Sequence, residues 1–420
     1  MINCTNKKLI VGLEIGTTKV ASLVGEVFPN GEINVLGLGN CPSKGINKGD
    51  INDLESIIKC IKKSIKQAED MSNHKIYAIN LAFSNQYINY KNEIGMVSIN
   101  KEEITKKDIK KVIKTAKSVR INDKFHILHI VPQEYIIDEK KGIENPLGLS
   151  GIRMQAKVHL ITSNYNIEKN IIKAVKRCKL RVDKIVFSGL ASGKAVLTEE
   201  EKKLGVCMID IGGGTIDVLI YIEGSLQHSQ VIPYAGDIIT NDISYAFSTP
   251  TSDAEYLKVK YGCASSFLQD NLNHIKITKS TNNESKILNQ EKLTEVIELR
   301  CLELLEIVNN QILNLQKKLK KKGRKYRLNS GIVLTGGVSK TKFFTDCAER
   351  IFQMQVRIGC ARNITGLINH VKTPEYSTVI GLLHFKNKNT SKKNEIFCKK
   401  KNWLYSINRW FNIYKILKLK

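Results

Sequence analysis

The chain has 420 residues, of which 42% are hydrophobic and 25% charged, so it is long enough for two lobes or three to four subdomains with their own cores. Its formal charge of +26 is spread along the whole chain together with abundant Ile and Asn, which indicates a compositional bias and argues against nucleic acid as a partner. The sequence contains no apolar leader, no run approaching about 18 apolar residues and no Cys-x-x-Cys pair among its ten cysteines, so we expect no secretion, no transmembrane helix, no disulfide framework and no zinc site.

The first predicted unit, residues 1–84, begins with an apolar run that ends in the carboxylate of Glu14 and a cluster of small residues. The residues of this cluster are Gly16, Thr17, Thr18 and Lys19. With the second apolar run over 20–27, the pattern predicts two buried strands joined by a tight turn, whose backbone N–H groups can bind phosphate. A single copy of this motif is weak evidence for a phosphate-binding site, because glycine after a strand often marks only a turn. A helix over 52–71 and a buried strand over 81–84 complete the unit.

The next segment changes its pattern and reads as a self-contained α/β insertion. We expect its strands and helix over 94–99, 105–118 (the helix), 125–131, 135–138 and 153–162. A further helix is expected over 167–179. The small residues of 189–197 predict a helix that approaches a neighbour closely, either as a connector between lobes or as a crowded core helix.

The first motif recurs half a chain later. An apolar run ends in Asp210, which is followed by Ile and by Gly212, Gly213, Gly214 and Thr215. Two copies imply two related half-domains that face one nucleotide. The carboxylates of Glu14 and Asp210, each at a strand end, can hold a hydrated Mg²⁺.

A third glycine-containing motif spans 331–340. It predicts a strand that ends in a turn at Gly336 and Gly337, followed by a helix over 342–352. Any α/β domain contains such connections. The sharper interpretation is that the two glycines let an adenine ring lie flat against the backbone.

Between the second and third motifs the chain carries a more helical stretch. We expect a helix beginning near Ala235, another with Ser252 as its N-cap, and a variable loop over 265–290. Glu255 and Lys258 share one face of the second helix and can form a surface ion pair. A long amphipathic helix over 293–320 follows, with a core-facing stripe of Ile297, Leu304, Val308, Ile312 and Leu315.

The C-terminal segment predicts a flexible basic linker over 386–401 and an amphipathic helix over 402–420. The apolar face of this helix contains Trp403, Leu404, Ile407, Trp410, Phe411, Tyr414 and Leu417. A core helix is rarely separated from its domain by a charged linker. We therefore favour an interfacial membrane anchor on anionic lipid over docking to a partner protein.

In chain order, the three motifs resemble the phosphate-1, phosphate-2 and adenosine loops of the actin-like ATPase superfamily. The resemblance is closest to the bacterial cell-division FtsA family, and it is collinear from about residue 7 to 385. The segments between the loops that carry it are 92–97 (NEIGMV), 132–135 (PQEY), 148–160 (GLSGIRMQAKVHL), 232–236 (IPYAG), 252–258 (SDAEYLK) and 376–384 (YSTVIGLLH).

The resemblance implies an α/β, actin-like ATPase fold: two duplicated βββαβα lobes around a nucleotide cleft, with an inserted small α/β subdomain. The implied domains are 1–84 plus 363–385 (lobe 1A), 85–163 (inserted 1C), 164–234 plus 326–362 (lobe 2A), 235–325 (smaller 2B), the linker 386–401 and the membrane helix 402–420.

The same resemblance implies a function in cell division. The protein would bind ATP with Mg²⁺, self-assemble, and anchor the tubulin-like FtsZ ring to the cytoplasmic face of the inner membrane at the septum. Other division proteins would bind the inserted subdomain. Glu255 and Lys258 would reach the ribose and adenine edge. Most superfamily members have Asp where this chain has Glu14, which is one methylene longer, so at most weak ATP hydrolysis is expected, and no residue is assigned as general base.

Two other classes remain possible at this level. One is a sugar- or glycerol-kinase-like phosphotransferase on the same fold, which needs a substrate acid in the cleft and no membrane helix. The other is a nucleotide-sensing chaperone-like module, which needs a β-rich peptide-binding domain that this chain has no room for. The insertion and the C-terminal segment argue against both.

Overall fold

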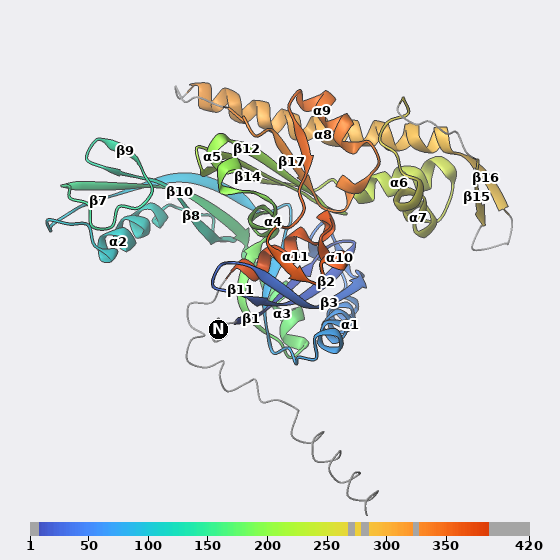
Figure 1. The fold of residues 1–420 in the computed structure, drawn as a ribbon, viewed down its shortest axis with the longest axis horizontal. Coiled ribbons are helices and arrows are strands. Elements are labelled where there is room, and N and C mark those ends of the chain that lie inside the picture. The colour runs from blue at the N-terminus through green and yellow to red at the C-terminus, as the bar shows by residue number, and fades with distance from the viewer. Residues whose placement is uncertain (1–7, 268–273, 279–284, 322–326, 386–420) are drawn as a thin grey trace, which may run out of the picture. The chain divides into compact units, whose positions relative to one another are not determined.

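The computed structural model describes residues 8–267, 274–278, 285–321 and 327–385, and its N-terminal strands belong to a six-stranded sheet (Figure 1). The strands of this sheet are β1 (Lys8–Ile15), β2 (Lys19–Val27), β3 (Ile33–Pro42), β6 (Ala78–Phe83), β11 (Arg181–Phe187) and β19 (Ile364–Gly366). Their order is β11-β6-β1-β2-β3-β19. β2 is antiparallel to both β1 and β3, whereas β6 pairs in parallel with β1 and with β11.

A second sheet repeats this arrangement. Its strands are β12 (Val206–Ile211), β13 (Ile216–Ile222), β14 (Ser225–Ile232), β17 (Ile332–Thr335) and β18 (Val356–Ile358). Their order is β14-β13-β12-β17-β18, with antiparallel pairing among the first three and parallel pairing for the rest. Counted in chain order within each sheet, the second sheet follows the order 3-2-1-4-5, and the first follows the same order with its sixth strand, β19, added beside the third. This repeat confirms the prediction of two duplicated α/β lobes.

Helices cover each sheet on the face that the apolar pattern predicts. In the first lobe these are α1 (Leu54–Ser72) and α3 (Tyr165–Arg177); in the second they are α8 (Gln290–Lys321) and α9 (Phe344–Phe352). Asp53 caps α1 by accepting hydrogen bonds from the N–H groups of Glu55 and Ser56. The predicted stripe of α8 is buried in the core of the second lobe, as expected.

One predicted boundary is wrong. Residues 164–234 were expected to belong entirely to the second lobe, but β11 pairs with β6 in the first sheet, and α3 contacts α1 and β11. Strand pairing decides the placement, because β11 forms the fifth strand of the first sheet, as β18 does in the second. The chain therefore enters the second lobe only after Phe187.

The inserted segment forms its own four-stranded sheet and core. Its elements are β7 (Asn89–Ser98), α2 (Lys106–Lys117), β8 (Phe125–Ile137), β9 (Lys140–Ile143) and β10 (Arg153–Asn164), in the sheet order β7-β10-β8-β9. Two separate strands were expected over 125–131 and 135–138. The structure has one continuous strand, because a bulge in the pairing with β10 accommodates Pro132.

The insertion contacts β14 of the second lobe through a group that we call the histidine cluster: the buried His159, His228 and Ser229, the partly buried Tyr90 and the exposed Asn92. His159 has Nδ1 at 2.6 Å from Asn92 Oδ1 and Nε2 at 2.8 Å from Ser229 Oγ. The Tyr90 hydroxyl lies 2.8 Å from His228 Nδ1. Since an amide oxygen only accepts, Nδ1 of His159 carries the proton and Nε2 accepts from the serine, which fits a neutral ring.

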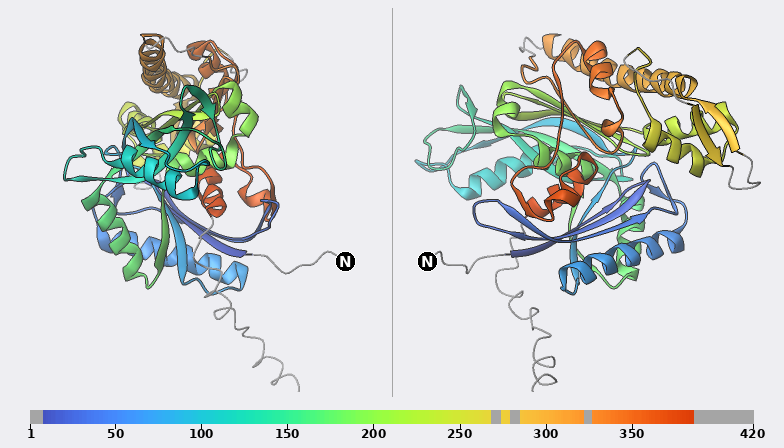
Figure 2. Two further views of the ribbon diagram at one scale, coloured as in Figure 1. Left: turned by 90° about the vertical axis from the view of Figure 1, so that its left-hand side faces the viewer. Right: turned by 45° about the vertical axis from the view of Figure 1, so that its right-hand side comes forward.

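The stretch between β14 and β17 contains α6 (Gly236–Phe247), α7 (Thr251–Tyr261) and the whole of α8 (Figure 2). Two expectations fail here. Ser252 is not an N-cap, because α7 begins at Thr251 after Pro250 and its cap makes no side-chain hydrogen bond. The expected loop over 265–290 contains an antiparallel pair of strands, β15 (His274–Thr278) and β16 (Ser285–Asn289), which the Asn/Ser-rich composition obscured.

Two helices meet between the lobes. α4 (Ser188–Val196) leads from β11 toward the second sheet, and α11 (Ser377–Gly381) follows β19 after the chain has returned to the first. A side chain on Gly381 would collide with the backbone of Ala191, so the two helices approach as closely as backbones allow. This confirms close helix approach for the small-residue segment. The remaining short elements are β4 (Ile46–Asn47), β5 (Asp50–Ile51), α5 (Glu199–Leu204), η1 (Val338–Lys340), α10 (Ile368–Val371), η2 (Pro374–Tyr376) and η3 (Leu382–His384).

In the part of the chain that the structure describes, no helix has the length and apolarity needed to span a bilayer. The predicted linker 386–401 and helix 402–420 lie outside the described residues.

Candidate functional site

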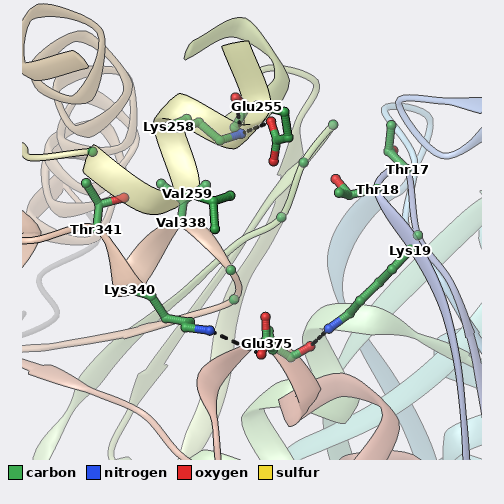
Figure 3. A pocket seen from close by; sticks show the side chains of 18 of the residues that line it. Thr17, Thr18, Lys19, Glu255, Lys258, Val259, Val338, Lys340, Thr341 and Glu375 are labelled. Atoms are coloured by element: carbon green, nitrogen blue, oxygen red, sulfur yellow. Dashed lines mark hydrogen bonds and ion pairs between the residues drawn. The ribbon is translucent and has the colours of Figure 1, made fainter. Parts of the chain in front are cut away.

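A cavity of about 1020 Å³ opens between the two lobes, and every residue that the sequence assigned to a nucleotide site lines it (Figure 3). These residues are Glu14, Gly16, Thr17, Thr18, Lys19, Asp210, Gly212, Gly213, Gly214, Thr215, Glu255, Lys258, Gly336 and Gly337. They come from β1–β2, β12–β13, α7 and the turn after β17, which are far apart along the chain. The fold therefore brings the three motifs and the α7 pair to one place.

The first two motifs form matching turns. In the first, the N–H of Gly16 donates to the Lys19 carbonyl at 3.0 Å; in the second, the N–H of Gly212 donates to the Thr215 carbonyl at 3.0 Å. The two turns face one another closely: a side chain on Gly213 would collide with Thr18. Glycine is therefore required where the lobes meet, and both turns present backbone to the same space.

Lys19 reaches across the base of the cleft. Its ammonium donates to the Glu375 carbonyl and lies 4.0 Å from the centre of the Tyr376 ring, as Figure 3 shows for the Glu375 contact. Burial lowers the pKa of Lys19, and the carboxylates of Glu14 and Glu375 oppose this effect. In this arrangement Lys19 is held by the segment before α11.

The two predicted metal-binding carboxylates occupy equivalent positions at the ends of β1 and β12. Burial raises the pKa of Glu14 to about 7, with a further contribution from Asp210 and an opposing one from Lys19. Burial also raises the pKa of Asp210. Among the described residues, Glu14 Oε2 is buried without a hydrogen-bond partner. Such an orphaned acceptor fits a hydrated cation, which would supply the missing donors.

Hydroxyl groups hold Asp210. Its Oδ2 accepts from Ser192 at 2.5 Å and from Thr378 at 3.3 Å, and these two hydroxyls are 2.9 Å apart. We call Glu14, Asp210, Ser192 and Thr378 the carboxylate cluster. Sequence reasoning missed both hydroxyl residues, although each lies in a segment that it had singled out: the small-residue helix and the YSTVIG segment.

A further carboxylate was also missed. Asp217 lines the cavity and accepts a hydrogen bond from Ser84 at 2.5 Å, which joins the second lobe to the end of β6 in the first. Burial raises the pKa of Asp217 well above its usual range, and Asp210 adds to the shift. Asp217 closes the second motif in the sequence, so its position in the repeat was the available signal.

Glu255 and Lys258 form an ion pair of 2.6 Å within the cavity wall. Lys258 also donates to the Gly236 carbonyl at 3.1 Å and to Thr240 at 2.7 Å. The two residues therefore form the expected ion pair and also line the cavity. The lysine is largely buried, so it is more than a solvated surface charge.

Gly336 and Gly337 differ in what they do. Gly336 has φ +86°, and a side chain there would collide with Asp210 and the Ile211 carbonyl. The turn and its close approach to β12 therefore already require glycine here, a reason that the interpretation of space for a ring did not include. Nothing lies within 4 Å of the position that a Cβ on Gly337 would take, so only Gly337 borders open space.

Comparison with known proteins bears on the family of the chain as a whole. Residues 207–381 match the family of the cell division protein FtsA, and residues 85–162 match the SHS2 domain inserted in FtsA. The chain is 56% identical over 415 residues to the cell division protein FtsA of Buchnera aphidicola subsp. Schizaphis graminum (strain Sg), covering 98% of this chain and 99% of the relative. It is 50% identical over 416 residues to that of Escherichia coli (strain K12), with coverage of 98% and 99%.

Solved structures share the fold at low identity. The PilM-PilN type IV pilus biogenesis complex matches with a TM-score of 0.63 and 14% identity, over 89% of this chain and 97% of that one. MreB5 of Spiroplasma citri bound to ADP matches with a TM-score of 0.51 and 14% identity, over 90% and 95%. The MamK double helical filament matches with a TM-score of 0.51 and 11% identity, over 89% and 97%.

These relatives confirm the resemblance inferred from the motifs and do not favour a sugar-kinase-like phosphotransferase. The chain belongs to the family of the cell division protein FtsA and has the fold of the actin-like ATPases.

Proposed function

We propose that this protein is an ATP-binding scaffold of cell division that self-assembles and anchors the FtsZ ring to the cytoplasmic face of the inner membrane at the septum. The observation that carries the proposal is that the three glycine-containing motifs, which lie far apart along the chain, line one cavity between the lobes together with the α7 ion pair. A cavity of about 1020 Å³ is large enough for a nucleotide.

In this proposal the nucleotide phosphates meet Gly16, Thr17, Thr18 and Lys19 from the first lobe and Gly212, Gly213, Gly214 and Thr215 from the second. Mg²⁺ would neutralise phosphate charge and be oriented through water by Glu14 and Asp210, with the orphaned Glu14 Oε2 as support. Glu255 and Lys258 would meet the ribose and adenine edge. Gly337, which borders open space, would border the base.

Hydrolysis is a secondary part of the proposal. A carboxyl whose pKa is about 7 is only partly ionised at neutral pH, which weakens Glu14 as a partner for a hydrated cation. We therefore propose at most a weak ATPase whose nucleotide serves assembly.

The proposed partners are assigned to different parts of the chain. The FtsZ tail would bind 235–325, other division proteins would bind the insertion 85–163, and anionic lipid would bind 402–420. Relatives with this fold support self-assembly, since MamK forms a double helical filament. The proposed division into lobes 1–84 plus 363–385 and 188–234 plus 326–362 follows the two sheets, with 164–187 moved to the first.

The nucleotide site is tested at Gly337. A Gly337→Val change puts a branched side chain into open cavity without backbone strain, since this residue has φ −65°. Fitting the nucleotide beside this added side chain should cost about 1–3 kcal/mol. The affinity for ATP, measured by equilibrium titration, should therefore fall roughly tenfold to a hundredfold. Gly337→Ala, a smaller addition, should lose less, and thermal unfolding should be unchanged in both. Wild-type affinity in a folded Gly337→Val variant would remove this cavity as the nucleotide site.

The membrane role is tested on the C-terminal segment. Deleting 402–420 should leave a folded, ATP-binding protein that no longer co-sediments with anionic vesicles, because each large apolar residue buried in the interface contributes up to about 1.5–3 kcal/mol. Trp410→Glu, on the apolar face, should weaken vesicle binding strongly. Asn412→Glu, on the opposite face, is the matched control and should do much less. Equal losses from the two substitutions would contradict an amphipathic anchor.

A further inference from the structure

The carboxylate cluster lies where the two helices between the lobes meet. Ser192 belongs to α4 and Thr378 to α11, and both are buried against Asp210. The helices touch without intervening side chains, since a Cβ on Gly381 would collide with Ala191. A change in what holds either hydroxyl therefore acts directly on the contact between α4 and α11.

Each hydroxyl has more possible acceptors than protons. A hydroxyl carries a single O–H, so it donates one hydrogen bond at a time. Ser192 Oγ lies 3.1 Å from the Ser188 carbonyl, 2.5 Å from Asp210 Oδ2 and 2.9 Å from Thr378 Oγ1. Thr378 has Asp210 Oδ2 at 3.3 Å, and its hydrogen bond to Glu14 lowers the pKa of that carboxyl. Which acceptor receives each proton depends on the charge at Glu14 and Asp210.

A hydrated divalent cation would change that balance. Metal-bound water is a strong donor, and it would compete with the two hydroxyls for the same carboxylate oxygens. A hydroxyl displaced from Asp210 still has a neighbour: Ser192 can donate to the Ser188 carbonyl within α4, and Thr378 can donate to Ser192. In these alternative pairs Ser192 bonds within α4, Thr378 bonds across from α11 to α4, and neither hydroxyl holds Asp210.

We propose that Ser192 and Thr378 are positioning residues that transmit cation occupancy in the cleft to the contact between α4 and α11. The inference rests on the proposed nucleotide site and adds the route by which that site acts on the junction of the lobes. Neither residue needs to touch the nucleotide for this role.

The test compares two substitutions of Thr378 with a neighbour. Thr378→Val keeps the shape and removes the hydroxyl, whereas Thr378→Ser keeps the hydroxyl. Ser377→Ala is the matched control, because its hydroxyl lies one residue away on α11 and bonds Thr335 at 2.7 Å in place of a carboxylate. Amide hydrogen exchange in α4 and α11 is measured with ATP, with and without Mg²⁺, beside the ATP affinity under both conditions.

In wild type, Mg²⁺ should change exchange in both helices, and Thr378→Val should reduce that Mg²⁺-dependent difference about tenfold, the scale set by one hydrogen bond to a charged group. Thr378→Ser should restore it, and Ser377→Ala should retain it. ATP should still bind Thr378→Val. If that variant does not fold, Ser192→Ala, which also removes one hydroxyl from Asp210, decides the same point.

The outcomes separate the two proposals. Failure of wild type to bind ATP would refute the nucleotide site itself. Wild type that binds ATP but shows no Mg²⁺-dependent exchange in α4 and α11, or a hydroxyl-deleted variant that behaves as wild type, would overturn the positioning role and leave the nucleotide site standing.

Discussion

The carboxylate cluster and the histidine cluster are both polar and largely buried, and each joins strands of two different sheets. They differ in charge. In the histidine cluster, the two ring nitrogens of His159 each have a partner and no formal charge is needed, although His228 Nε2 has no hydrogen-bond partner among the described residues. The carboxylate cluster contains two acids, and Glu14 Oε2 has no partner among the described residues. The first cluster therefore holds its junction without charge, whereas the second presents two carboxylates that the proposed cation would neutralise.

Protons affect the two clusters in opposite directions. Burial lowers the pKa of His159 to about 3 and that of His228 to about 4; the His228 charge adds to the first shift and Lys318 to the second. Burial raises the pKa of Glu14 to about 7. A histidine whose pKa is lowered by folding makes the folded protein less stable as the pH falls. A carboxyl whose pKa is raised by folding makes the folded protein less stable as the pH rises.

The largest expected effect is therefore that of acid on the insertion. Between pH 6.5, where unfolded histidine titrates, and about pH 4, opening the junction takes up protons, and each unit of pKa depression corresponds to about 1.4 kcal/mol. Amides of β7, β10 and β14 should lose protection over this range, while those of β1 and β12 do not. Hydrogen exchange corrected for its intrinsic pH dependence measures both. Equal loss of amide protection in both sets of strands would contradict the proposed difference between the two clusters.

The second prediction removes one ring at neutral pH. His159→Ala leaves Asn92 and Ser229 without their partner and opens a cavity, so it should lower the free energy of unfolding by about 2–4 kcal/mol. His74→Ala is the control, because that ring is partly exposed and only bonds the nearby Ser72 carbonyl at 2.6 Å; its cost should stay within about 0.5 kcal/mol. Denaturant unfolding compares them. Similar costs would mean that the histidine cluster contributes little to the junction.

The smallest expected effect concerns Glu14. Glu14→Gln resembles the protonated acid, so it should stabilise the protein by about 1–2 kcal/mol at pH 8, where ionising the buried carboxyl is costly. At pH 5 the folded wild-type carboxyl is protonated while the unfolded one is still largely ionised, so the stabilisation should shrink to less than half of its pH 8 value, and it should vanish only below the unfolded pKa of about 4.5. Thermal unfolding at both pH values gives the comparison. A stabilisation that is the same at pH 5 and pH 8 would show that charge at Glu14 is not its cause.

Local patterns predicted the strands, the glycine turns and the paired carboxylates, because each depends on a few consecutive residues. The turn at Gly16–Lys19 and its counterpart at Gly212–Thr215 illustrate this, since apolar runs and glycines define both hairpins.

Features that depend on distant partners escaped prediction. Ser192 and Thr378 are 186 positions apart, and nothing in either segment indicates that their hydroxyls meet at Asp210. β11 was assigned to the wrong lobe because its pairing with β6 bridges the whole insertion. Gly336 was correctly placed in the cavity. Glycine is needed there because the turn lies against β12, and this contact can be seen only once the arrangement of the sheet is known.

The pairing of β19 with β3 has a consequence for synthesis on the ribosome. Residues 364–366 close the outer edge of a sheet whose other strands end by residue 187, and η3 packs on β1 and β6 near residue 383. During translation the first sheet thus lacks its edge strand beside β3 until nearly the whole second lobe has emerged from the ribosome. A chain that stops before Ile364 would therefore contain every strand of the second sheet, which ends at Ile358, yet lack the edge strand of the first sheet and the η3 turn that packs on it.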